Sequence, residues 1–179
     1  MNTYLFFVEM ESDIEKFRVD PKNFIKNTSK KDITSGYGVV SFYFQKKSNI
    51  SCVGKKTNQD LSNEVAKRSF TREIDILAHC HHPTIVPFIG FAEINGFGTI
   101  YLVEAKNGSL QDYLDKNRTE SRDPNFNDTT NYIISYGVAR CMAFLHDQNR
   151  IHRDLKPENI LLDDQLYPLV TDFVTSKQI

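Results

Sequence analysis

Short runs of β-branched and aromatic residues dominate the first half of the chain. Val39–Phe44 and Ile50–Val53 predict two strands, and the polar stretch between them, residues 45–49, predicts their turn. Two further apolar runs, Ile85–Ile89 and Thr99–Val103, predict another pair of strands. The front of the chain is therefore expected to form a sheet.

Apolar positions at helical spacing predict helices over Leu61–His79, Ser109–Lys116 and Thr130–Asp147. The third helix carries an apolar stripe of Ile134, Val138, Cys141 and Leu145. After it, Ile160–Leu162 and Leu169–Thr171 flank a polar turn and predict a small hairpin. This order of elements predicts an α+β fold with a β-rich front half and a helical back half.

Composition narrows the class of protein further. The chain has 179 residues, 40% of them hydrophobic, and a net charge of −1, which argues against nucleic acid or an anionic membrane as a partner. Cys52, Cys80 and Cys141 lack metal-ligand spacing and are expected to be buried thiols. The apolar run Tyr4–Val8 is too short to cross a membrane and lacks a basic flank, so a cytoplasmic protein is expected.

The nine residues Ile151–Asn159 carry the strongest chemical signal. Phosphoryl transfer from a nucleotide requires a carboxylate to accept the hydroxyl proton, a cation beside the transferred phosphoryl group, and ligands for Mg²⁺. Asp154 is expected to be the base, Lys156 the γ-phosphate contact and Asn159 a metal ligand. Asp172, which follows the predicted hairpin and precedes a phenylalanine, is expected to be the second metal ligand.

The front half supplies a matching cation and carboxylate. Strand alternation places Lys55 on the same face as Val53, and Glu73 lies on the apolar side of the helix over Leu61–His79. A carboxylate buried there requires a cation, and Lys55 is expected to pair with Glu73 and to hold the nucleotide's α- and β-phosphates. Lys56 is the rival cation, but the pleat directs it to the opposite face.

A nucleotide also needs a phosphate-binding turn and an apolar pocket for its base. Gly36 and Gly38 are expected to let backbone N–H groups approach the phosphates. The connector Val103-Glu104-Ala105 would present backbone groups to adenine. The apolar walls of the adenine site are assigned to Val40, Val53 and Leu161, although taken alone these three residues would be ordinary core.

Together these motifs resemble the eukaryotic protein kinase family, and most closely the serine/threonine kinases of the tyrosine-kinase-like group. The resemblance covers residues 24–179 and rests on Phe70–Leu77, His82–Val86, Asn107–Leu110 and the catalytic loop over residues 151–159. It implies a two-lobed fold with ATP in the cleft, ATP and Mg²⁺ as cofactors, and transfer to Ser/Thr hydroxyls of proteins. The expected division is an extension over 1–20, a complete N-lobe with one helix over 21–104, and a partial helical C-lobe over 105–179.

The chain departs from the family pattern at four places. Thr34 replaces the first glycine of a turn that is one residue short, the connector over residues 101–108 is about two residues short, and Val174 replaces the glycine after Asp172-Phe173. The fourth departure is the end at Ile179, before an activation segment, which predicts an exposed stripe on the Thr130–Asp147 helix and a protein partner that covers it. A truncated or degenerate kinase that binds nucleotide without turnover is therefore the alternative, and a gene fragment without stable function is a third reading.

Overall fold

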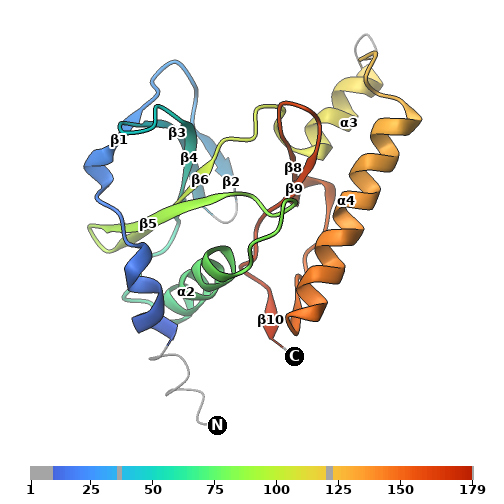
Figure 1. Cartoon of the computed structure of the whole chain (residues 1–179). Coiled ribbons are helices and arrows are strands. Elements are labelled where there is room, and N and C mark those ends of the chain that lie inside the picture. The colour runs from blue at the N-terminus through green and yellow to red at the C-terminus, as the bar shows by residue number, and fades with distance from the viewer. Residues whose placement is uncertain (1–9, 36–37, 120–122, 179) are drawn as a thin grey trace. The chain divides into compact units, whose positions relative to one another are not determined.

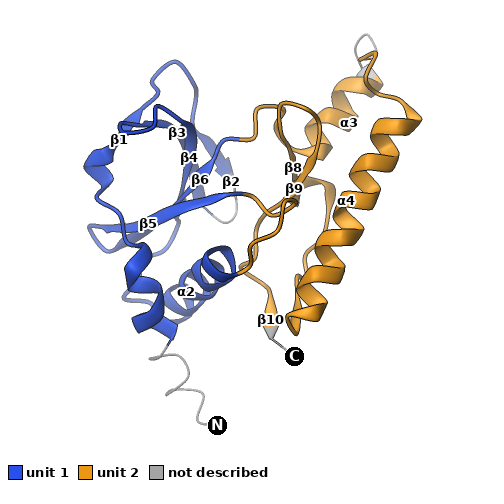
Figure 2. Cartoon of the chain, in the orientation of Figure 1, with its two compact units in different colours: residues 1–79, 87–104 blue, residues 80–86, 105–179 orange. Residues whose placement is uncertain are grey.

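A computed structural model describes residues 10–35, 38–119 and 123–178, which belong to two compact units (Figures 1 and 2). The first unit comprises residues 1–79 and 87–104, and the second comprises residues 80–86 and 105–179. The first contains a β-sheet and helix α2 (Glu64–His79), and the second combines helices with two short two-stranded sheets. The α+β class predicted from the sequence is confirmed.

The first unit is built on an antiparallel sheet with the strand order β1-β3-β4-β6-β5, and β2 pairs with β3 beside β1. The strands are β1 (Phe24–Lys26), β2 (Ile33–Ser35), β3 (Gly38–Gln45), β4 (Ser51–Thr57), β5 (Phe88–Ile94) and β6 (Phe97–Val103). The predicted strand over Ile85–Ile89 is wrong in its bounds. Ile85 makes only an isolated bridge to Val170, and β5 begins after Pro87, whose nitrogen cannot donate to a strand ladder.

Aromatic side chains fix α2 and β1 to the sheet. The ring of Phe24 stacks on Tyr101 with a centroid distance of 3.7 Å, and Phe70 of α2 meets Phe91 of β5 edge-on at 5.9 Å.

The predicted helix begins at Glu64 rather than Leu61 because Asn63 caps it. The side-chain oxygen of Asn63 accepts the N–H groups of residues 65 and 66 at 2.9 and 3.2 Å.

The second unit contains the elements of the chain's back half. They are α3 (Leu110–Thr119), α4 (Asp128–Asp147), β7 (Arg150–Ile151), a 3₁₀ turn (Pro157–Asn159), β8 (Ile160–Leu162), β9 (Pro168–Val170) and β10 (Lys177–Gln178). The predicted hairpin is confirmed as β8 and β9, with Leu161 opposite Leu169. Helix α4 begins at Asp128, two residues earlier than predicted, because the side chain of Asn127 accepts the N–H of Thr130.

The segment over residues 80–86 belongs to the second unit, although the sequence division placed it in the first lobe. The N–H of Val86 donates to the carbonyl of Val170 at 3.0 Å, and the N–H of Val170 donates to the carbonyl of Thr84 at 2.7 Å. The His82 ring stacks on Phe144 of α4 at 5.0 Å. These contacts hold the segment between β9 and α4.

The apolar stripe of α4 is largely buried within its own unit, so the expectation that it lies exposed is wrong. Ile134, Cys141 and Leu145 are at most 5% exposed, and Val138 is half-buried. Gly137 lies on the same face and lets Pro168 of β9 approach, since a Cβ there would lie 2.5 Å from the Pro168 ring. The β8–β9 hairpin therefore covers this face of α4, which the sequence pattern alone did not indicate. The expected protein partner stays a prediction.

The three cysteines are free and buried, as predicted. Burial raises the pKa of both the Cys52 and Cys141 thiols to about 11, which keeps them protonated and unreactive at neutral pH.

Over the described ranges, no helix combines the length and the apolar character that crossing a bilayer requires.

The close approach of α4 to β9 generates a stability prediction. Gly137→Val should lower the free energy of unfolding by about 1–3 kcal/mol, because the added side chain overlaps the buried Pro168. The matched control is Ala139→Val, which introduces the same side chain at an exposed position of the same helix. Urea unfolding followed by circular dichroism measures both variants, and equal losses would contradict the packing argument.

Candidate active site

Residues predicted to carry chemistry fall into two sets, one in each unit. In the first unit, Lys55 of β4 and Glu73 of α2 form the expected ion pair, with Lys55 Nζ 2.9 Å from Glu73 Oε1. The side chain of Glu73 is 4% exposed and that of Lys55 is 15% exposed. The neighbouring Lys56 points to the other face, where its Nζ lies 4.7 Å above the ring centre of Phe97. The strand alternation therefore identified the correct lysine of the two.

The expected adenine walls of this unit share a sheet face with Lys55. Val40 of β3 lies directly opposite Lys55 of β4, and Val53 is two residues from Lys55 along the same strand. Both valines are half-buried. The pleat thus places two apolar side chains beside the ammonium group of Lys55, an arrangement that suits a ligand with an apolar ring and an anionic tail.

The glycine turn has a structural role that the sequence did not indicate. Gly38 begins β3 with φ of +141°, and a Cβ on it would lie 1.9 Å from the carbonyl oxygen of Lys56. Glycine is therefore required at this position for the pairing of β3 with β4. Thr34 pairs with Val39 in the β2–β3 ladder. Gly36 lies outside the described residues, so its predicted phosphate contact stays a prediction.

The connector after β6 is partly occupied by protein contacts. The N–H of Val103 donates to Pro87, and the N–H of Glu104 donates to the carbonyl of Ser51 at 3.1 Å. The Glu104 carboxylate forms an ion pair with Lys30, a contact that the sequence did not indicate. Ala105 begins the second unit, where its carbonyl accepts the N–H of Gly108. The N–H and the carboxylate of Glu104 are thus already engaged.

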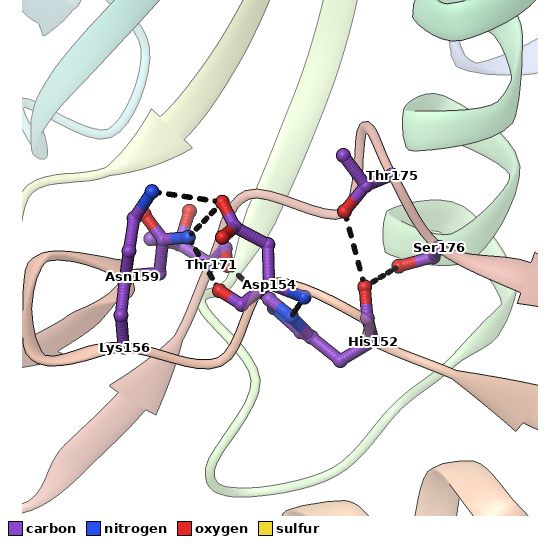
Figure 3. A network of polar contacts seen from close by, with 7 residues as sticks. All are labelled: His152, Asp154, Lys156, Asn159, Thr171, Thr175 and Ser176. Atoms are coloured by element: carbon purple, nitrogen blue, oxygen red, sulfur yellow. Dashed lines mark hydrogen bonds and ion pairs between the residues drawn. The ribbon is translucent and has the colours of Figure 1, made fainter.

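In the second unit, the catalytic loop surrounds Asp154 with donors (Figure 3). Lys156 Nζ lies 2.9 Å from Asp154 Oδ2, and Asn159 Nδ2 donates to the same oxygen at 3.0 Å and to the Asp154 carbonyl at 2.7 Å. The hydrogen bond from Lys156, followed by that from Asn159, holds the pKa of the Asp154 carboxyl below its usual value of 3.8. Asp154 is therefore ionised at neutral pH and can accept a proton.

His152 is buried at the centre of this loop. Its Nε2 lies 2.9 Å from the carbonyl oxygen of Thr171, and its Nδ1 accepts the N–H of Asp154 at 3.3 Å. These partners assign the proton to Nε2. The ring also meets Phe173 edge-on at 5.0 Å, and Phe173 is fully buried. One imidazole thus links the loop to the segment that carries Asp172.

The residues expected to hold Mg²⁺ carry the oxygen ligands that this ion prefers. Asn159 turns its amide nitrogen toward Asp154, so its oxygen Oδ1 points away from Asp154 and can serve as a ligand. The Thr171 N–H donates to the Asn159 carbonyl at 3.0 Å, which brings Asp172 next to this position. No cluster of three or more His, Cys, Asp or Glu ligands occurs in the described ranges.

Val174, which replaces the glycine of the family pattern, does not have positive φ. Positive φ occurs instead at Asp172, with φ of +65°, and at Arg153, with φ of +71°. Aspartate tolerates this left-handed region far better than a β-branched residue does. The valine therefore fits the observed conformation of the Asp172-Phe173-Val174 segment.

Sequence reasoning missed the two hydroxyls that follow Val174. Thr175 Oγ1 and Ser176 Oγ donate to the carbonyl of His152 at 3.2 and 3.3 Å (Figure 3). Strand β10 then pairs with β7, which places Lys177 opposite Ile151. Such contacts join residues far apart in the sequence, and no local sequence pattern predicts them.

Leu161, the expected adenine wall of this unit, is half-buried on β8 and bridges to Ser109.

Comparison of the sequence with known proteins identifies the family of the chain. The family model of the protein kinase domain matches residues 28–179. Interleukin-1 receptor-associated kinase 1 of Mus musculus is 32% identical over 140 residues, which cover 77% of this chain and 19% of that protein. A probable LRR receptor-like serine/threonine-protein kinase of Arabidopsis thaliana is 37% identical over 116 residues, 63% of this chain and 12% of that protein.

A third relative, the putative 3-phosphoinositide-dependent protein kinase 2 of Homo sapiens, is 36% identical over 110 residues, 60% of this chain and 26% of that protein. The chain thus spans between 12% and 26% of the length of these curated relatives. The matched region contains the Lys55–Glu73 pair, the catalytic loop and Asp172. On these residues and this match, the chain belongs to the eukaryotic protein kinase family, of the serine/threonine kind.

Proposed function

We propose that this chain binds ATP with Mg²⁺ and transfers the γ-phosphoryl group to Ser or Thr hydroxyls of a protein. The observation that carries the proposal is the ionised Asp154, which is held between the Lys156 ammonium and the Asn159 amide. One relative of the chain is named as a receptor-like serine/threonine-protein kinase and another as a kinase. Lys156, two residues after the base, resembles the serine/threonine form of the loop.

Asp154 accepts the proton of the attacking hydroxyl as the new O–P bond forms and the bond between the β- and γ-phosphates breaks, which releases ADP. Lys156 lies beside the same carboxylate oxygen and places a positive charge where the transferred phosphoryl group gains negative charge. Asn159 and Asp172 hold Mg²⁺, which neutralises charge on the phosphates when bound.

Lys55 holds the α- and β-phosphates, and Glu73 fixes its direction. The ammonium of Lys55 is constrained by the 2.9 Å contact with a carboxylate that is almost fully buried. A pre-oriented cation loses little side-chain entropy when a phosphate arrives, so the pair favours binding. Val40 and Val53 on the same face contribute apolar surface for the base.

The role of Asp154 is tested by Asp154→Asn, which keeps the shape of the side chain and removes the base. Phosphoryl transfer should fall by roughly 10²- to 10⁴-fold, the usual contribution of a general base. The assay measures label transferred from radiolabelled ATP to myelin basic protein and to the chain itself. The matched control is Asp164→Asn in the exposed turn after β8, which should keep the native rate.

Equal transfer by the native chain and Asp154→Asn would contradict the proposal, because the signal would then not come from this loop. Binding of ATP without transfer above the Asp154→Asn level would instead support the alternative function, a nucleotide-binding module without turnover. The glycine turn with Thr34 at its first glycine position is the observation that favours this second candidate.

The role of Lys55 in nucleotide binding is tested with the double variant Lys55→Met/Glu73→Leu. Replacing both members avoids leaving a buried unpaired charge, so the fold should be retained. Thermal shift should show that millimolar ATP with Mg²⁺ raises the Tm of the native chain, and that the double variant loses most of this rise. Lys56→Met is the control and should keep the full shift, and an undiminished shift in the double variant would refute the assignment.

A further inference from the structure

Positive charge is concentrated in one stretch of the first unit. Between Val19 and Lys56 the sequence contains eight lysines and two aspartates, whereas the whole chain contains 22 lysines and arginines and 23 aspartates and glutamates. Lys55 and Lys56 have the partners described above. The other six lysines are exposed and are called here the basic surface: Lys22, Lys26, Lys30, Lys31, Lys46 and Lys47. A chain of almost neutral net charge therefore has one strongly basic region.

The strand pairing gathers these lysines around one edge of the sheet. Strand β1 is the last strand of the order β1-β3-β4-β6-β5, at one edge of the sheet (Figure 1). The N–H of Lys46 donates to the carbonyl of Asn23 at 2.8 Å, so Lys22 and Lys47, each one residue away, lie on neighbouring segments. The other three lysines end β1 or lie in the turn that follows it, before β2. Positive charge therefore flanks β1 at both ends.

Carboxylates already occupy two of the six ammonium groups. Lys26 Nζ lies 2.7 Å from Asp32 Oδ2, and Lys30 pairs with the carboxylate of the connector after β6. Asp20, the second aspartate of the stretch, accepts the backbone N–H of Lys22 at 2.9 Å and caps the turn before β1. Among the residues that the structure describes, no ion pair engages the remaining four lysines, which are Lys22, Lys31, Lys46 and Lys47. Their positive charge is therefore uncompensated there.

An exposed apolar side chain lies between these charges. Ile25 is the central residue of β1, and 52% of it is exposed. It lies opposite Phe44 of β3, which is half-buried and extends the apolar area across the two strands. An apolar centre with a polar, charged rim is the usual composition of a surface that binds another protein. The surface therefore offers both apolar burial and charge pairing to a ligand.

We propose that the basic surface binds an acidic segment of a partner protein, with an apolar side chain against Ile25 and carboxylates on the surrounding lysines. Neighbouring like charges raise the energy of the free surface, and an acidic segment removes this repulsion when it binds. The two lysines that already hold carboxylates, Lys26 and Lys30, favour this chemistry over the phosphates of a nucleic acid or a lipid. No residue assigned to nucleotide binding or phosphoryl transfer takes part, so the docking proposal does not depend on the proposed kinase function.

The experiment measures the Kd of a fluorescein-labelled peptide, Glu-Asp-Glu-Ile-Glu-Asp-Glu, by fluorescence anisotropy with the whole chain. The triple variant Lys22→Gln/Lys46→Gln/Lys47→Gln should weaken binding by roughly 3- to 100-fold, as the loss of up to three exposed ion pairs suggests. All three side chains are exposed, so the fold should be retained. Ile25→Ser should weaken binding by roughly 3- to 10-fold, because it removes the apolar contact.

The matched control is Lys106→Gln/Lys116→Gln/Arg118→Gln, which removes the same charge from exposed positions of the second unit and should keep the native Kd. An equal loss in this control, or an unchanged Kd in the first triple variant, would overturn the proposal. Tighter binding of phosphatidylserine vesicles or of single-stranded oligo(dT) than of the peptide, lost in the first triple variant, would also overturn it, because the surface would then have another class of partner.

Lysines at a sheet edge also discourage the pairing of that edge with another chain. A second peptide, with lysine at each acidic position, separates this role from docking. Equal binding of the two peptides would refute the docking proposal, and self-association of the first triple variant in light scattering would then assign the lysines to protection of the edge. Binding of the acidic peptide alone supports docking. Since no nucleotide is present, failure of phosphoryl transfer leaves this outcome unaffected.

Discussion

A buried carboxylate is the constraint on which the first unit depends. Glu73 lies on the inner face of α2 with 4% of its side chain exposed, and an unpaired charge there would cost several kcal/mol. Lys55 supplies the counter-charge only if β4 keeps its register, with Lys55 opposite Val40 on one side and Ile100 on the other. A slip by one residue would present the other face of the strand, so the ion pair and the sheet register stabilise each other.

A buried imidazole has the equivalent place in the second unit. His152 accepts the N–H of Asp154, contacts the Thr171 carbonyl and offers its own carbonyl to Thr175 and Ser176. The catalytic loop and the segment after β9 are therefore oriented by one residue rather than by separate contacts. Arg153 and Asp172, two of the residues with left-handed backbone, lie next to the residues that His152 contacts, where the surrounding hydrogen bonds can hold a strained backbone.

Residues whose chemistry is local could be predicted from the sequence. The choice of Lys55 over Lys56 followed from the pleat of one strand, and the Asp154 loop followed from nine consecutive residues. Helix α2 was placed within three residues, and the error arose because the Asn63 cap was not recognised as the start signal. Where the periodicity was strong and the contact lay within one element or between neighbours, the physical rules were sufficient.

Features that depend on distant segments could not be predicted. From the sequence alone, the apolar stripe of α4 is expected to be exposed. Pro168, which covers the helix at Gly137, comes from a hairpin about thirty residues further along the chain. The contacts of residues 11–19 with α2 and the engagement of Glu104 by Lys30 are of the same kind. A stripe of apolar residues shows that a face must be covered, but it does not identify the cover.

The valine after Phe173 shows how a substitution should be judged against the backbone rather than against the family pattern. Glycine is required only where φ is positive or where a side chain has no room. In the segment over residues 172–174, positive φ occurs at Asp172, and Val174 does not have positive φ. A β-branched side chain resists the left-handed region, so Val174 disfavours rearrangements that would need positive φ at that position. The substitution is thus consistent with a segment that keeps Phe173 buried against His152 and Thr171 hydrogen-bonded to Asn159.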